Sequence, residues 1–337
     1  MSSTRMSSRN STSSSPGAGA WLPALALVLS GCASTPKSMM MVSRPLVDLR
    51  GEPRTTAQPG VHDPLQETQL LYGERVNVLE RRDGWAFVEA LEQEEFSHNR
   101  RWQGYPGWVP ESSLAPWREE PLPTIVVTAP WAESWANPYL TVKSDWTFAM
   151  GTYLTATEIG GRFWRVDLPK GERAWLELGD AREMWRILRL VPEAKRQLII
   201  EQAEKFIGTP YLWGGRSALG DSDLSVVTGV DCSALVNLAY RVVGMDLPRD
   251  AHEQYLRAKS LALPKPGDLV FLSAEHEPKR IVHVMLYAGG DELIEAPGTG
   301  QRVRRISVQE RLGRPLASLK PGDTMSAQTI WFGSYLP

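Results

Sequence analysis

The sequence of 337 residues predicts an α+β domain at the C-terminal end, preceded by two small β-rich units. Between residues 45 and 191, short alternating segments are separated by Gly, Pro and Asp turns, a pattern typical of antiparallel strands. After residue 192, helical patterns come first and strand patterns follow them, which is typical of the α+β class. The composition is that of a globular protein, and the net charge of −2 gives no electrostatic argument for binding nucleic acid.

The first 32 residues have the features of an export signal. A Ser-rich stretch precedes the apolar run Trp21–Ser30, which is too short to span a bilayer but suits a signal peptide. The sequence LSGC, ending at Cys32, resembles a bacterial lipobox, in which this cysteine is acylated. That resemblance implies an exported protein held by lipid in the cell envelope, on the periplasmic face of the outer membrane. The alternative is an ordinary secretory signal with a chance cysteine.

Residues 33–44 are expected to be a tether, and residues 45–118 the first β-rich unit. Its order of motifs, LYGE, then GWAFVE, then GYPGWV, resembles a bacterial SH3-like (SH3b) domain. The polar stretch 92–101 within it is expected to form a hairpin tip. Residues 119–191 repeat part of this pattern and are interpreted as a second SH3b-like domain. Both units are expected to be small β-barrels.

The remaining residues, 192–337, contain Cys232, the strongest candidate for a reactive side chain. A helical pattern follows Asp231 and Cys232 and ends at Gly244. At a helix start, unpaired backbone amides and the helix dipole lower the pKa of a thiol and favour the nucleophilic thiolate. Because the chain has two cysteines, lipidation of Cys32 would leave Cys232 unpaired. The alternative is that Cys232 is a small buried apolar residue.

A catalytic thiol needs a base, and this region offers three histidines. His252 lies at a helix start and His276 in a charged loop, so both are expected at the surface. His283 interrupts an apolar strand, where a lone histidine is more often a core residue. Neither a metal-ligand cluster nor a phosphate-binding loop stands out, so no metal or cofactor is expected.

Five motifs in order change the interpretation of His283. They are TPYLWGG at 209–215, DCS at 231–233, LPR at 247–249 with Gln254, PGDLVF at 266–271 and HV at 283–284 before Tyr287. Together they resemble the NlpC/P60 family of papain-like cysteine peptidases, over about residues 195–337. The resemblance implies a papain-like fold and cleavage of peptidoglycan stem peptides between γ-D-Glu and a diamino acid.

The same resemblance implies roles for single residues. Cys232 matches the nucleophile, His283 the general base and Glu295 the residue that orients it, although the family more often has histidine at this last position. Tyr211 matches a tyrosine beside the thiol, and Ser233 is expected to line the cleft.

A subgroup of the family recognises a free N-terminal L-Ala, and Asp250 matches the aspartate that binds its ammonium. An acidic residue and a tyrosine of the first SH3b domain close the cleft in that subgroup, and Glu74 and Tyr105 are the candidates here. Asp231 is a second ammonium partner or a helix cap, and Asp250 is itself an alternative helix cap.

The resulting hypothesis is a monomeric, lipid-anchored cysteine endopeptidase. It would cut L-Ala-γ-D-Glu–meso-diaminopimelate peptides after D-Glu through a Cys232 thioester. Two alternatives stay open at this point: a catalytically inactive wall-binding lipoprotein, and an acyltransferase or amidase on the same fold.

Overall fold

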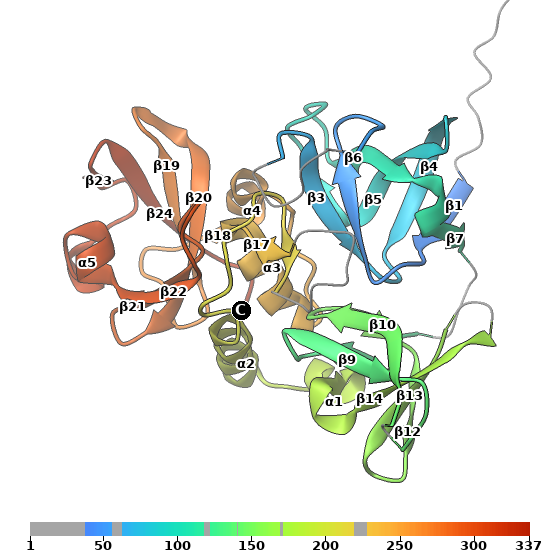
Figure 1. Cartoon of the computed structure of the whole chain (residues 1–337). Coiled ribbons are helices and arrows are strands. Elements are labelled where there is room, and N and C mark those ends of the chain that lie inside the picture. The colour runs from blue at the N-terminus through green and yellow to red at the C-terminus, as the bar shows by residue number, and fades with distance from the viewer. Residues whose placement is uncertain (1–37, 56–62, 118–121, 140, 169–170, 219–227) are drawn as a thin grey trace, which may run out of the picture. The chain divides into compact units, whose positions relative to one another are not determined.

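The computed structural model describes residues 38–55, 63–117, 122–139, 141–168, 171–218 and 228–337 (Figure 1). These ranges belong to one compact unit that begins at residue 37. The expected export signal and Cys32 lie outside the described residues. Within those residues, every helix is too short or too polar to cross a membrane.

The first β-rich unit is one seven-stranded antiparallel sheet in the order β3-β2-β6-β5-β4-β1-β7. Its elements are β1 (Ser38–Val42), β2 (Leu46–Arg50), β3 (Gln66–Leu71), β4 (Arg75–Arg82), β5 (Trp85–Glu95), β6 (Gln103–Pro110), the 3-10 helix η1 (Glu111–Ser113) and β7 (Leu114–Pro116).

The expectation that residues 33–44 form a tether is wrong for 38–42. These residues form β1, which pairs with β4 and β7, because the apolar run Met39–Val42 supplies a strand that packs on the unit's core. The expected hairpin tip lies between β5 and β6.

The second β-rich unit consists of two small sheets, β10-β9-β14-β13-β12 and β11-β8-β15. Their bounds are β8 (Ile125–Val127), β9 (Trp131–Trp135), β10 (Lys143–Ala149), β11 (Tyr153–Leu154), β12 (Ala156–Ile159), β13 (Phe163–Asp167), β14 (Arg173–Glu177), η3 (Leu178–Asp180) and β15 (Ala181–Glu183). The short helix α1 (Met184–Leu188) follows.

The C-terminal domain has helices first and an antiparallel sheet after them, as the sequence predicts. The sheet has the order β18-β24-β19-β20-β21-β22, and β23 pairs with β24. Its elements are α2 (Pro192–Glu204), β16 (Arg216–Ser217), β17 (Gly229–Val230), α3 (Cys232–Val242), α4 (Ala251–Arg257), β18 (Lys259–Ser260), β19 (Leu269–Ala274), β20 (Glu277–Gly289), β21 (Glu292–Glu295), β22 (Arg304–Ser307), α5 (Val308–Leu312), η4 (Leu316–Ser318), β23 (Thr324–Met325) and β24 (Gln328–Ser334).

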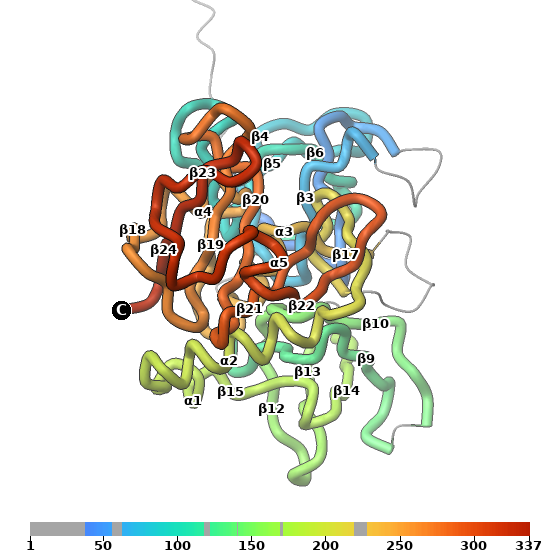
Figure 2. Tube along the Cα trace, turned by 90° about the vertical axis from the view of Figure 1, so that its left-hand side faces the viewer, coloured from blue at the N-terminus to red at the C-terminus, as the bar shows by residue number. Residues whose placement is uncertain are grey.

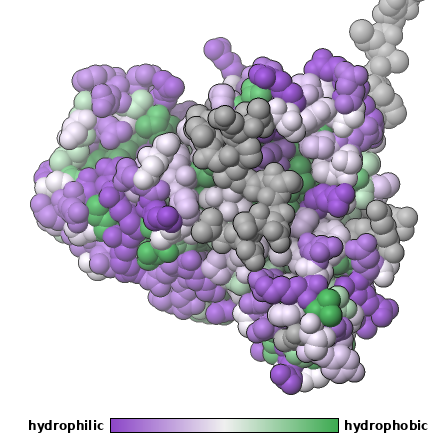
Figure 3. Space-filling model, viewed as in Figure 1, coloured by the Kyte–Doolittle hydropathy of each residue, from purple (hydrophilic) through white to green (hydrophobic). Residues whose placement is uncertain are grey.

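Helix α3 lies at the centre of the largest hydrophobic core, between the C-terminal sheet and the first β-rich unit (Figure 1). All eleven of its residues are buried. The same core includes Leu46 and Leu71 of the first unit and Met150 of the second. The face drawn in Figure 3 is mostly hydrophilic, with hydrophobic residues in small separate groups. All three parts of the chain therefore pack around the helix that begins at Cys232.

Candidate active site

Cys232 is the first residue of α3, as the sequence predicts. Asp231 is the N-cap in extended conformation, and its carboxylate accepts a hydrogen bond of 2.7 Å from the amide of Ala234. Cys232 is 8% exposed and forms no disulfide within the described residues. The thiol thus lies where the unpaired amides of the first helical turn converge.

His283 is brought to Cys232 by β20, which packs against α3. Its Nε2 lies 2.9 Å from Oε2 of Glu295, so Nδ1 is the ring nitrogen left for the hydrogen bond with Cys232. Burial lowers the pKa of His283, but the Cys232 sulfur and the Glu295 carboxylate outweigh burial and raise this pKa to about 9. The ring is therefore an imidazolium at neutral pH.

Glu295 ends β21, the strand beside β20, and is fully buried. Two arginines that sequence reasoning missed also bind its carboxylate. Arg304 donates to Oε1 from Nε at 3.0 Å and from Nη2 at 2.7 Å, and Arg311 donates from Nε to Oε2 at 3.0 Å. Burial raises the pKa of Glu295, but His283 and the two arginines lower it to about 2. Glu295 is therefore an ionised acceptor throughout the working pH range.

The expectations that Asp231 binds a substrate ammonium and that Ser233 lines the cleft are corrected by their hydrogen bonds. Besides Ala234, Asp231 accepts from the amide of Gly214 at 3.0 Å, from the Ser233 hydroxyl at 3.0 Å and from Arg249 Nη2 at 2.7 Å. Asp231 is thus a helix cap and an ion-pair partner. The Ser233 hydroxyl also accepts from Arg249, and both residues are buried.

The prediction that Glu74 closes the cleft is wrong. Glu74 is 1% exposed and lies inside the contact between the first β-rich unit and the C-terminal domain. Its two oxygens lie 2.9 and 3.1 Å from Nη1 of Arg216. Arg241 lies 3.7 Å away, and Gln93 donates to the carboxylate at 2.9 Å. Burial raises the pKa of Glu74, but the two arginines outweigh it and hold that pKa below its ordinary value. Glu74 therefore has a structural role.

Tyr105 and Asp250, which the sequence proposes separately as substrate-binding residues, come together from different domains. The Tyr105 hydroxyl lies 3.2 Å from Oδ2 of Asp250, which precedes α4. Burial raises the pKa of Asp250 to about 6, against the charge of Arg249, yet 42% of its side chain reaches solvent. This carboxylate is therefore packed against Tyr105 and Arg249 and still reaches solvent.

The hairpin tip between β5 and β6 holds Tyr105 in place by contacts with α4. Glu253 accepts from the backbone amide of Ser97 at 3.1 Å, Glu94 accepts from Arg257, and the Arg257 guanidinium lies 3.7 Å from the Trp102 ring centroid. These contacts join the β5–β6 hairpin to α4.

Tyr211 is half-buried and precedes β17 in the sequence. It forms an isolated parallel bridge with Val230, two residues before Cys232, and burial raises its pKa. Its position agrees with a role beside the reacting group.

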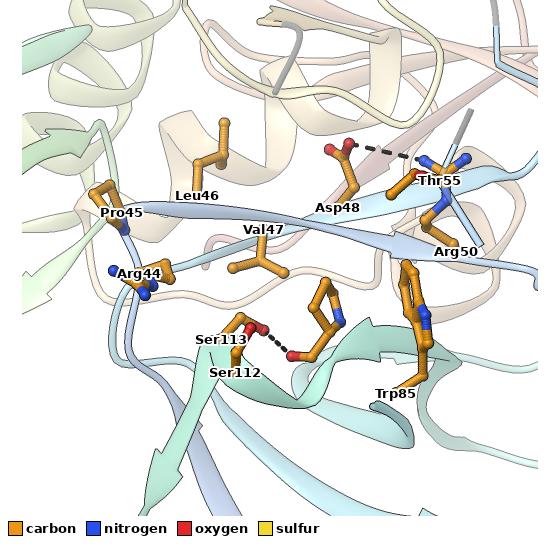
Figure 4. Close-up of a pocket in the computed structure, with 11 residues that line it drawn as sticks. Arg44, Pro45, Leu46, Val47, Asp48, Arg50, Thr55, Trp85, Ser112 and Ser113 are labelled. Atoms are coloured by element: carbon orange, nitrogen blue, oxygen red, sulfur yellow. Dashed lines mark hydrogen bonds and ion pairs between the residues drawn. The ribbon is translucent and has the colours of Figure 1, made fainter. Parts of the chain in front are cut away.

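A cavity of about 460 Å³ lies elsewhere, in the first β-rich unit (Figure 4). Two contacts join residues of its lining: Arg50 lies 3.9 Å from Asp48, and the Ser113 hydroxyl donates to the Pro110 carbonyl at 2.6 Å. Its lining does not include Cys232 or His283. This cavity is therefore separate from the candidate active site.

Comparison with known proteins agrees with this geometry. The NlpC/P60 family model matches residues 208–315, and the model of a bacterial dipeptidyl-peptidase Sh3 domain matches residues 61–94. The chain is 30% identical over 248 residues to the gamma-D-glutamyl-L-lysine dipeptidyl-peptidase of Bacillus cereus, covering 71% of this chain and 70% of that protein. This chain belongs to the NlpC/P60 family. It is a peptidase of that family with an SH3-like domain near its N-terminus.

Two further relatives extend the comparison of this NlpC/P60 peptidase. The Bacillus subtilis protein named gamma-D-glutamyl-L-lysine dipeptidyl-peptidase is 29% identical over 259 residues, which are 74% of this chain and 78% of that one. The crystal structure of an NlpC/P60 family protein from Bacillus cereus superposes with a TM-score of 0.68 at 24% identity, covering 89% of this chain and all of the other. The structural likeness establishes the fold.

Proposed function

We propose that this NlpC/P60 peptidase hydrolyses the bond between γ-D-Glu and a diamino acid, meso-diaminopimelate, in peptidoglycan stem peptides with a free N-terminal L-Ala. The observation that carries the proposal is the Cys232–His283–Glu295 constellation at the start of α3, in a domain whose Asp250 carboxylate reaches solvent. The names of the Bacillus relatives, which specify γ-D-glutamyl dipeptidyl-peptidases, support the bond assignment.

In the first half of the proposed reaction, the Cys232 thiolate attacks the γ-carbonyl carbon of D-Glu. The developing oxyanion is stabilised by the Cys232 backbone amide and by the Tyr211 hydroxyl. The His283 imidazolium then donates its proton to the leaving amine of the diamino acid, and a thioester remains on Cys232.

In the second half, neutral His283 removes a proton from water, which attacks the thioester. The carboxylate product leaves, and the thiolate–imidazolium pair is restored. Glu295 holds Nε2 of His283 in both halves, so Nδ1 keeps facing the sulfur.

Substrate selection is proposed to lie with Asp250 and Tyr105. A partly exposed carboxylate is suited to pair with a substrate ammonium, and Tyr105 of the SH3-like domain hydrogen-bonds to it. The chain would then act on stem peptides already freed from the glycan, because an intact wall blocks this amine.

We further propose that both β-rich units are SH3-like barrels, that the protein is a monomer, and that Cys32 carries a lipid anchor in the outer membrane, facing the periplasm. The LSGC sequence at residues 29–32 supports the anchor.

The purified full-length chain is expected to release L-Ala-D-Glu from L-Ala-γ-D-Glu–meso-diaminopimelate, as measured by mass spectrometry. A Cys232→Ala variant is expected to release none. Equal product from both proteins, or none from either, would reject the proposal.

Replacing Asp250 with asparagine is expected to raise KM for the free tripeptide by about tenfold, since a charge-assisted hydrogen bond contributes about 1.5–3 kcal/mol. An N-acetylated tripeptide should be a poor substrate for both proteins, and its KM should be the same for the wild type and the variant.

The pH dependence follows from the same carboxylate, whose charged neighbours are Arg249, Glu253 and Asp231, with Tyr105 bonded to it. The pKa of Asp250 is raised to about 6, so its negative charge is lost as the pH falls through that value. KM for the free tripeptide should therefore rise below about pH 6. A KM that is flat between pH 5 and 7 would contradict the role.

A further inference from the structure

The carboxylate of Glu295 has an environment that its proposed role does not explain. An orienting residue needs one acceptor for Nε2 of His283, yet this carboxylate receives four donor contacts. Oε2 is shared by His283 and Arg311, and both Arg304 contacts go to Oε1. Two guanidinium groups therefore converge on a single fully buried carboxylate.

The fold builds this arrangement from adjacent elements. Glu295 of β21 lies directly opposite Arg304 of β22 in the antiparallel register, where cross-strand side chains meet. Helix α5, which contains Arg311, follows β22 at once and lies against it (Figure 2). The side chains of Arg304 and Arg311 are 42% and 25% exposed, so both keep contact with water while the carboxylate does not.

The two arginines change the electrostatic state of the Glu295–His283 pair. A buried carboxylate with histidine as its sole partner has two outcomes that both harm catalysis. It takes up a proton and stops accepting from Nε2, or it stays ionised and binds the imidazolium so strongly that His283 does not release its proton to the leaving amine.

We propose that Arg304 and Arg311 are positioning residues that balance the charge of Glu295, so that Glu295 orients His283 without holding it permanently as an imidazolium. The groups that act on the site are Cys232 of α3, His283 of β20, Arg304 of β22 and Arg311 of α5. This inference rests on the proposed function, because it assigns a task to the same thiol and imidazole.

The direct test is the pH dependence of Cys232 alkylation by iodoacetamide, measured by mass spectrometry on the full-length chain. This readout needs no substrate. In the Arg304→Gln/Arg311→Gln double variant, the uncompensated carboxylate should move the basic transition of the profile, which reports the imidazolium, upward by about one pH unit. Hydrolysis of the tripeptide at pH 7 should fall by up to roughly tenfold, because an imidazolium whose pKa is one unit higher is a weaker acid toward the leaving amine.

Four matched variants separate this role from a structural one. Arg305→Gln changes the next residue on β22, which points to the other face and pairs with Glu292 and Glu204, and should leave the profile unchanged. Arg304→Lys and Arg311→Lys keep the charge and should stay close to the wild-type profile. In a Glu295→Gln background the two arginine substitutions should cause no shift, because no carboxylate charge remains to be balanced.

The inference is overturned if the double variant keeps the wild-type profile, or if the shift has the same size in the Glu295→Gln background. A protein that shows the expected alkylation shifts but cuts no tripeptide would reject the substrate assignment and keep the role of the two arginines.

Discussion

Replacing His283 with glutamine is expected to lower kcat for the tripeptide by at least ~10³-fold, within the range attributed to a general acid–base group. The substitution removes the proton donor for the leaving amine and the positive charge beside the sulfur. A free thiol has a pKa of about 8.5, so most of an unassisted thiol is protonated at neutral pH. Alkylation of Cys232 at pH 7 should slow together with hydrolysis.

His276→Asn is the matched control for this substitution. His276 lies exposed in the turn between β19 and β20 with φ of 58°, a conformation that asparagine adopts readily. Both rates should equal those of the wild type. A His283→Gln variant that keeps wild-type kcat would exclude this histidine as the catalytic acid and base.

Replacing Arg216 with methionine is expected to lower the free energy of unfolding by about 3–5 kcal/mol, the cost of leaving one partner of a buried ion pair behind. Arg216 is fully buried, and it also donates to the Gln69 carbonyl at 2.9 Å and to Asn237 at 3.1 Å. Urea unfolding of the full-length chain measures the loss. Arg81→Met, which breaks the exposed pair with Glu111, should cost at most about 1 kcal/mol.

The pH dependence of this stability has a definite sign. The pKa of Glu74 is lowered in the folded protein, so its contribution is present above the ordinary value of 4.5 and is lost as pH falls through the folded value. Without Arg216, burial pushes the pKa of Glu74 upward instead. The deficit of Arg216→Met should therefore be largest near pH 7 and shrink toward pH 4, and Glu74→Gln should relieve part of it. A deficit that does not change with pH would mean that the lost packing, and not the charge, causes it.

Local patterns of the sequence predicted much of the catalytic framework. The helix that starts at Cys232 follows from an apolar repeat with a capping aspartate before it and Gly244 after it. The strands of His283 and Glu295 follow from short apolar segments joined by a Gly-Gly-Asp turn. Because these residues belong to elements defined by neighbouring side chains, and because the family motifs lie in order, the sequence was enough to single them out.

The roles of other charged residues could be decided only by the tertiary structure. Glu74 and Asp250 are both carboxylates near recognisable motifs, yet one is enclosed by arginines and the other reaches solvent. Arg249 bonds to Thr68, 181 residues away, and so ties the cap of the Cys232 helix to the SH3-like domain.

The sequence by itself therefore determined the family, the order of the domains and the positions of the thiol and the imidazole. The tertiary structure decided which charged side chains are paired inside the protein and which reach solvent. The physical reason is that secondary structure depends on spacing within a few residues, whereas the state of a charge depends on its burial and on partners from distant parts of the chain.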